Sequence, residues 1–143
     1  MNLQMATRHA LFAILELAAQ PDRQVAAAEI AEKYGISLNH LSKVLRTLGR
    51  LGLVEAVRGV GGGYRFVGNA RRVTLLDIIG AFETVGTPAA SHREPGDDTA
   101  EGRALRSVME EIDILTRATL SSITVETMLK MIRRSQWNAP PAA

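Results

Sequence analysis

The 143-residue chain contains no cysteine, few aromatic residues and no long apolar run. The absence of cysteine excludes disulfide bonds, cysteine nucleophiles and thiolate-ligated metals or clusters within this chain. No stretch approaches the roughly 18 to 20 apolar residues that span a bilayer, so we expect no membrane contact. The N-terminus also lacks the basic, apolar and small-residue pattern of a signal peptide, which favours a cytoplasmic protein.

Acidic side chains are scarce in the middle of the chain. Residues 33–72 hold eight basic side chains against one acidic side chain, Glu55, whereas both flanking regions carry more acids than bases. The overall net charge is only +2, so positive charge is concentrated in this segment. A basic middle between acidic flanks predicts a face that binds a polyanion. The alternative is a solvated surface on which charges of one sign happen to cluster.

Apolar residues recur at helical spacing through the first part of the chain. This periodicity predicts helices within residues 6–20, 26–35 and 37–52. Gly35 suits a left-handed C-terminal cap on the second helix, and Ser37 suits an N-terminal cap on the third. We expect the third helix to bury Leu38, Leu41, Val44, Leu45, Leu48 and Leu51.

Two strand-like runs follow, Val54–Val57 and Tyr64–Val67, and a further helix is predicted from about Thr74 to Glu83. Residues 86–100 contain proline, glycine, serine and acids without periodicity, which predicts a loop. We therefore expect a first domain over residues 1–85 that ends where this loop begins.

The last part of the chain predicts two helices for assembly. A long amphipathic helix begins at Glu101, and after a break at the sequence SSIT a second helix spans Val125–Arg133. We interpret residues 101–134 as dimerisation helices and residues 135–143 as a flexible tail. Four apolar residues of the long helix alternate spacings of three and four, as in a coiled-coil seam, and form the predicted dimer interface: Leu105, Val108, Ile112 and Leu115.

The second and third predicted helices, joined by a tight turn at Gly35, form a helix-turn-helix. Its second helix presents hydrogen-bonding and cationic side chains and no acid, as a DNA recognition helix requires for base edges and phosphates. Helical pairs of this kind also occur as plain packing. The candidate DNA-binding residues on this helix are Ser37, Asn39, His40, Ser42, Lys43, Arg46 and Arg50.

The hairpin after the helix-turn-helix completes a winged helix, and its glycine-rich loop is the predicted wing tip. Gly61, Gly62 and Gly63 would let the backbone approach a phosphate or a minor groove closely, and Arg58 and Arg65 supply charge. A nucleotide-binding P-loop is excluded because a strand pattern follows the glycines instead of Lys-Ser/Thr and a helix. The alternative is a glycine-rich turn without a ligand.

These residues predict a mainly α-helical winged helix-turn-helix protein with a small β-hairpin wing and a long C-terminal dimerisation helix. The favoured function is a sequence-specific DNA-binding regulator. A winged helix used as a protein–protein adaptor is the alternative, but such an adaptor would carry an uncharged or acidic recognition helix. An enzyme is excluded, because no cysteine, paired-carboxylate or nucleophile motif assembles a reaction centre.

The segment YGISLNHLSKVLRTLGRLGLVEAVRGVGGGYRFV strongly resembles the IscR/NsrR-type family of winged-helix transcriptional regulators. The opening MNLQMATRHALFAILELA and the later VTLLDIIGAFE match the same family pattern. The resemblance covers residues 1–85 closely and residues 101–130 by architecture, and the phrase VRGVGGGYRF is quite specific to the family.

The resemblance implies a homodimeric repressor whose long helices pack across a two-fold axis and present two wings to a palindromic operator. It implies groove and phosphate contacts from the polar residues between Ser37 and Arg46, and a wing contact from Arg58 and Gly61–Gly63. The bases that these residues would read do not carry over.

The chain departs from the family in the loop that carries three cluster-ligating cysteines in many members. Here that loop reads GTPAASHREPGDDTAEG and contains none, so we expect no cofactor. Either the chain is a cysteine-free member that senses another signal, or its ligands have been replaced. His92, with the nearby Glu94, Asp97 and Asp98, is a weak candidate for a metal or effector site, and a solvated polar loop is the favoured interpretation.

Overall fold

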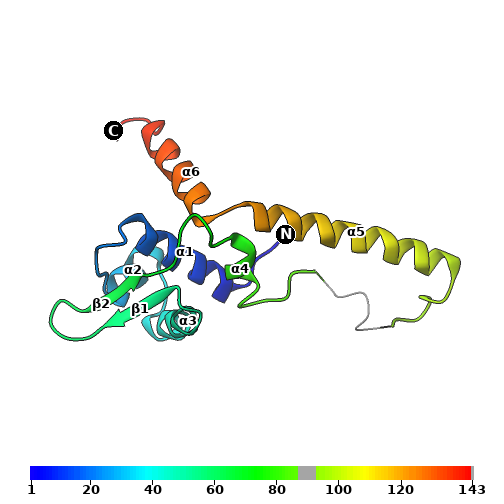
Figure 1. Cartoon of the computed structure of the whole chain (residues 1–143), viewed down its shortest axis with the longest axis horizontal. Helices are drawn as coiled ribbons and strands as arrows, with labels where there is room; N and C mark the ends of the chain where they lie inside the picture. Colours follow the sequence, from blue (N-terminus) through cyan, green and yellow to red (C-terminus); the bar gives the residue numbers. More distant parts are fainter. Residues whose placement is uncertain (87–92, 143) are drawn as a thin grey trace.

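The computed structural model describes residues 1–86 and 93–142, and Figure 1 shows their arrangement. A body of four helices and one hairpin packs around α1, and the long helix α5 projects away from it. The elements are α1 (Met5–Ala19), α2 (Ala27–Tyr34), α3 (Leu38–Arg50), β1 (Val54–Val57), β2 (Gly63–Phe66), α4 (Leu75–Ile79), α5 (Ala100–Ser122) and α6 (Val125–Trp137). The predicted mainly helical winged fold with one small hairpin is confirmed.

The core forms where the apolar faces of α1 and α3 meet. Ile14 and Leu17 of α1 are completely buried, as are Leu41, Leu45 and Leu48 of α3. These residues recur at the three- and four-residue spacing of one helix face, so each helix buries a continuous stripe. The packing fixes the orientation of α3 relative to the rest of the body.

The turn between α2 and α3 has the predicted caps. Gly35 adopts the left-handed conformation with φ 63° and ends α2, and the amide of Ile36 donates to Ala31 O at 2.9 Å. Ser37 then caps α3, because its hydroxyl accepts from the amide of His40 at 3.3 Å. The helix-turn-helix geometry therefore follows from residues that lie within the turn itself.

Two of the residues predicted to be buried on α3 are about half exposed. Leu38 is 49% exposed because it lies in the first turn, to one side of the stripe that faces α1. Leu51 is 48% exposed because it follows the last residue of the helix. The prediction that both are buried was wrong. Helical periodicity shows which residues share a face, but it does not show how far along that face the neighbouring helix extends.

The hairpin pairs β1 with β2 in an antiparallel register in which Glu55 lies opposite Arg65. The second strand is Gly63–Phe66 rather than the predicted Tyr64–Val67, because its ends lie opposite the two ends of β1, with Gly63 paired to Val57 and Phe66 to Val54. The backbone of Val25 also pairs with Tyr64. The Val25 amide donates to Tyr64 O at 2.9 Å, and the Tyr64 amide donates to Val25 O at 2.8 Å. The loop before α2 thus pairs with the second strand of the hairpin, next to the wing loop.

Helix α4 is shorter than predicted. Thr74 and Asp77 form a capping box at its start, but the regular helix ends after Ile79 and Gly80 follows. Ala81–Glu83 continue in turns, in which the Glu83 amide donates to Ile79 O at 3.0 Å. Low helix propensity at Gly80 explains why the helix does not extend to Glu83.

The C-terminal part consists of α5 and α6, separated at Ile123 and Thr124. Ile123 has extended dihedral angles, and Thr124 bridges to Thr74 and caps α6. Helix α6 then packs on α1 through Val125 and Leu129 and continues to Trp137, so it extends past the predicted Arg133 and into the predicted tail. None of the helices in the described ranges combines the length and the apolar character that crossing a bilayer requires.

Candidate DNA-binding surface

The exposed face of α3 carries a stripe of polar and basic side chains. Asn39, Lys43, Arg46 and Arg50 are exposed and follow one another at spacings of four, three and four residues. At 3.6 residues per turn these positions share one face of the helix, opposite the buried leucines. We call these four residues the α3 stripe. It presents one amide and three cations with no acid, which suits contact with base edges and phosphates.

The two serines predicted to contact DNA have partners within the chain. Ser37 accepts the capping hydrogen bond from His40, and the Ser42 hydroxyl donates to Leu38 O at 2.8 Å. Each hydroxyl retains further hydrogen-bonding capacity, but both first stabilise the start of α3. Their role as DNA contacts stays a prediction.

His40 lies beside the α3 stripe and packs against α1. Its ring meets the ring of His9 edge-on, with centroids 4.9 Å apart. His40 Nε2 and His9 Nδ1 are buried and have no hydrogen-bond partner within the described residues. Burial lowers the pKa of His9, and charge on His40 and Arg8 lowers it further. Packing between α1 and α3 explains the position of His40. His40 is therefore a weaker candidate for a DNA contact than the exposed Asn39 and Lys43.

The wing glycines are explained largely by the conformation of the chain. A methyl group on Gly63 would lie 2.5 Å from Val25 O, and one on Gly62 would lie 2.8 Å from Gly59 O and clash with Val57 O. The amide of Gly62 is also committed, since it donates to Gly59 O at 3.0 Å. Close backbone approach therefore requires glycine at both positions without any ligand.

The outermost part of the wing is formed by Gly59, Val60 and Gly61. Gly61 has φ 75° and faces open space, so it remains the glycine with the best access to a ligand. Val60 projects fully into solvent and was not among the predicted contact residues. The sequence signal was available, because Val60 lies between Gly59 and Gly61 at the predicted wing tip, where a valine has no core to pack against.

The two arginines that flank the wing differ in their contacts. Arg65 pairs across the hairpin with Glu55, as the strand register requires. Arg58 is exposed, and no ion pair of its side chain occurs within the described residues. Arg58 is therefore the better candidate for a phosphate contact, while Arg65 would first have to leave its partner. Arg71 and Arg72, exposed after the hairpin, extend the basic surface.

Helix α5 exposes the predicted seam. None of its 23 residues is buried in the single chain, and beyond its contact with α4 it extends away from the body (Figure 1). A helix that hides no apolar side chain gains little from packing, so an exposed apolar seam predicts a partner surface. The seam residues are Leu105, Val108, Ile112 and Leu115, which are 64%, 54%, 48% and 60% exposed.

The acidic residues before α5 make hydrogen bonds and ion pairs around the first turns of that helix. Asp97 accepts from the Glu94 amide at 2.8 Å and pairs with Arg106, and these contacts lower its pKa. The side chain of Arg103 donates to Asp98 O at 2.7 Å, and Thr99 caps the helix. The candidate His92 lies outside the described residues. Within the described ranges, no three histidine or acidic side chains are grouped as a metal site would require.

The geometry of a winged helix with a basic exposed stripe agrees with the comparisons to known proteins. A family model named Rrf2 and described as an iron-dependent transcriptional regulator matches residues 3–131. The chain belongs to the Rrf2 family. A Rhodopseudomonas palustris protein named as an HTH-type transcriptional regulator, BadM, is 52% identical over 146 residues, which cover all of this chain and 92% of that protein.

Solved structures agree with this assignment. IscR of T. potens is 27% identical, with a TM-score of 0.78 over 98% of this chain and 94% of that one. CymR of B. subtilis, named as the global cysteine regulator, is 24% identical with a TM-score of 0.76 over 92% of this chain and 98% of that one, and supports the fold alone. The Rrf2 protein is thus a DNA-binding transcriptional regulator and not an enzyme, and the resemblance drawn from the sequence is confirmed.

The family is described as iron-dependent, but this chain has no thiolate that could hold an iron–sulfur cluster. The sequence has no cysteine, and Asp97 is held by Arg106 and by a backbone amide. Thiolate sulfur is the usual ligand of iron–sulfur clusters in proteins.

Proposed function

We propose that this Rrf2 regulator acts as a homodimeric repressor that binds a palindromic operator without an iron–sulfur cluster. The observation that carries the proposal is the α3 stripe, an acid-free face of a helix whose other face is locked into the core. A rigid helix that presents polar and cationic groups outward suits insertion into the major groove, where the amide of Asn39 can read a base edge.

In this proposal, the two copies would dimerise through α5. Its exposed seam would be covered by the same seam of a second copy, which satisfies the self-complementarity of a two-fold interface. Two copies related in this way place two α3 stripes on one duplex. A symmetric reader selects a symmetric site, with half-sites about one helical turn or a multiple of it apart.

Repression would follow because the bound dimer occupies the operator. A dimer that covers two half-sites and inserts its wings beside them excludes other proteins from that stretch of DNA. Arg58 and Arg46 would supply the sequence-independent part of the affinity by phosphate contact, and Asn39 would supply discrimination. Transcription in vitro from a promoter that contains the selected site should decrease as protein is added.

The test of the proposal is selection of bound duplexes from a random pool by the purified protein, with iron, sulfide and visible absorbance measured on the same anaerobic sample. We expect a colourless protein that enriches a palindrome. Enrichment of no sequence would overturn DNA specificity and favour the protein–protein adaptor. Stoichiometric iron with visible absorbance would overturn the cluster-free part and direct mutagenesis to His92.

A further inference from the structure

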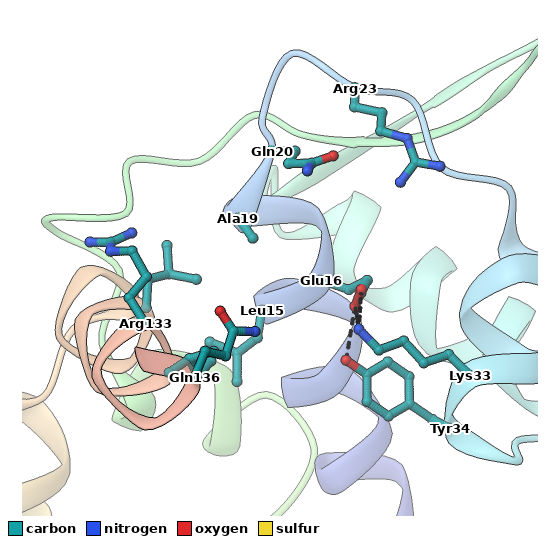
Figure 2. Close-up of a pocket in the computed structure, with 11 residues that line it drawn as sticks. Leu15, Glu16, Ala19, Gln20, Arg23, Lys33, Tyr34, Arg133 and Gln136 are labelled. Carbon is teal, nitrogen blue, oxygen red and sulfur yellow. Dashed lines mark hydrogen bonds and ion pairs between the residues drawn. The ribbon is translucent and has the colours of Figure 1, made fainter. Parts of the chain in front are cut away.

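The charged side chains where α1 faces α2 have partners within the chain. Lys33 Nζ donates to the two carboxylate oxygens of Glu16 at 2.7 and 2.8 Å, and the Tyr34 hydroxyl donates to the same carboxylate at 2.9 Å (Figure 2). Arg23, in the loop between the two helices, pairs with Glu29 at 2.8 Å. These contacts stabilise the fold. The tip of the wing differs, because an apolar side chain there has no core to pack against.

The tip of the wing carries a single side chain. Val60 is the one residue with a side chain between Arg58 and Tyr64, and the other positions are glycines: Gly59, Gly61, Gly62 and Gly63. Gly59 and Gly61 have φ of 105° and 75°, and a methyl group on either would face open space. Val60 itself is fully exposed. The tip is therefore a thin strip of backbone with one isopropyl group at its end.

Turn chemistry does not explain a valine at this position. Turns favour glycine, proline, asparagine, aspartate and serine, each for its backbone conformation or its local hydrogen bonds. A β-branched apolar side chain supplies neither, and Val60 packs on nothing in the described chain. Contact with a bound partner would give the isopropyl group a surface to cover. That partner is DNA, because the exposed Arg58 lies beside the tip and this Rrf2 protein binds DNA.

The hairpin has the reach and the width to place its tip in the minor groove. It extends to one side of α3, which is seen almost end-on in Figure 1. At about 3.3 Å per residue, the chain from Val54 to Val60 spans at most about 20 Å. With α3 in the major groove, the adjacent minor groove lies about half a turn of B-DNA away, about 17 Å. That groove is only about 6 Å wide, which suits a tip almost free of side chains.

We propose that Val60 contacts the floor of the minor groove beside each half-site and discriminates there against G·C pairs. In this groove a G·C pair presents the guanine N2 amine, whereas an A·T pair presents only acceptors. The isopropyl group has no acceptor, so an amine covered by it loses its hydrogen bonds to water without replacement. Adenine carries a C–H in place of the amine, which the methyl groups can contact. The proposal rests on the proposed function in placing α3 in the major groove.

Arg58 and Val60 then have different roles in the wing. Arg58 supplies charge, which acts on every sequence and is detected as salt dependence. Val60 carries no charge and changes the preference between sequences without changing the salt dependence. The Gly62 amide donates to Gly59 O at 3.0 Å, so it is already committed within the turn. Sequence preference from the wing therefore depends on the one side chain at its tip.

The test compares two duplexes of the same mixed sequence, one with guanine and one with inosine at every guanine position. Inosine lacks the N2 amine and retains the major-groove groups of guanine, so the comparison isolates the minor groove. Fluorescence anisotropy with the full chain should show binding to the inosine duplex at least about fivefold tighter, as removal of an unsatisfied donor requires. Equal affinity for the two duplexes would overturn the proposal.

Matched variants assign the preference to Val60. Val60→Thr keeps the branched shape and adds a hydroxyl that can accept from the amine, so the preference should decrease to less than about twofold while the salt slope is retained. Val67→Thr is the control, because Val67 lies at the other end of the hairpin and is 43% exposed. It should retain the full preference. A preference that persists in Val60→Thr, or that is lost in Arg58→Ala because charge reads a narrow groove, would overturn the proposal.

The inosine comparison requires no operator, so its outcome is separate from duplex selection. Enrichment of a palindrome without an inosine preference would refute the role of Val60 alone. An inosine preference without an enriched palindrome would refute the palindromic operator alone. The failure of one proposal is therefore distinguishable from the failure of the other.

Discussion

His9 of α1 packs edge-on against His40 of α3, with ring centroids 4.9 Å apart and an interplanar angle of 77°. The contact joins the central helix of the body to the helix that carries the DNA-binding stripe. A buried ring nitrogen on each histidine has no partner within the described part of the chain, so a proton gained there would be poorly compensated.

Acid should destabilise the protein through His9. The folded pKa lies below the ordinary 6.5, so the unfolded chain binds the proton first as the pH falls. The stability contributed by neutral His9 is complete above about pH 6.5, decreases below it, and stops decreasing below the lowered folded pKa. Urea unfolding across this range should show a smaller pH dependence in His9→Phe. An identical pH dependence in both proteins would contradict a lowered pKa of His9 in the folded chain.

Removal of one cation from the α3 stripe should weaken binding to every duplex. Arg46→Ala should reduce the slope of log affinity against log salt by about one unit, as loss of one phosphate contact requires. The same change at Arg103, which lies on α5, is the control and should leave the slope unaltered. Fluorescence anisotropy at several salt concentrations measures both, and an unchanged slope in Arg46→Ala would remove it from the interface.

Asn39 should contribute specificity instead of general affinity. Asn39→Ala should lose about 1 to 3 kcal/mol of discrimination at one position of each half-site and should keep the salt dependence. Competition between the selected duplex and singly altered duplexes measures the difference. Uniform weakening on all sequences would show that Asn39 contacts only the backbone.

Two glycines of the wing, Gly63 and Gly61, should contribute unequally to the stability of the fold. Gly63→Ala should destabilise the fold by about 2 kcal/mol or more, because the added methyl meets the backbone of Val25. Gly61→Ala faces open space and pays only for its φ of 75°, about 1 kcal/mol. Thermal unfolding ranks the two variants, and an equal loss would show that Gly63 does not pack on Val25 in solution.

The exposed seam of α5 should hold the dimer together. Ile112→Glu places a charge in the seam and should yield a species near the 15.5 kDa of the single chain by light scattering. Ile114→Glu, on another face of the same helix and 66% exposed, is the matched control and should remain dimeric. A dimeric Ile112→Glu would place the interface elsewhere.

The sequence predicted those parts of the fold whose cause is local. Gly35 and Ser37 define the turn of the helix-turn-helix, and the spacing of Leu41, Leu45 and Leu48 defines the buried face of α3. Each of these features depends on residues within a few positions of one another, so backbone preference and periodicity are sufficient to predict them.

Features that depend on distant segments could not be predicted. The requirement for glycine at position 63 comes from Val25, the orientation of His40 comes from His9, and the burial of Leu129 arises because α6 returns to pack on α1. Local periodicity and backbone preference do not show which distant segments meet. The exposure of Leu38 has the same origin, because only the position of α1 decides which side of α3 is covered.

The most direct test of the account is the stoichiometry and symmetry of the complex with a selected duplex. Sedimentation of that complex should give two chains per duplex, and hydroxyl-radical footprints should show protection related by a two-fold axis, with half-sites about one helical turn or a multiple of it apart. One chain per duplex, or protection without symmetry, would contradict a dimer that reads DNA with two α3 stripes.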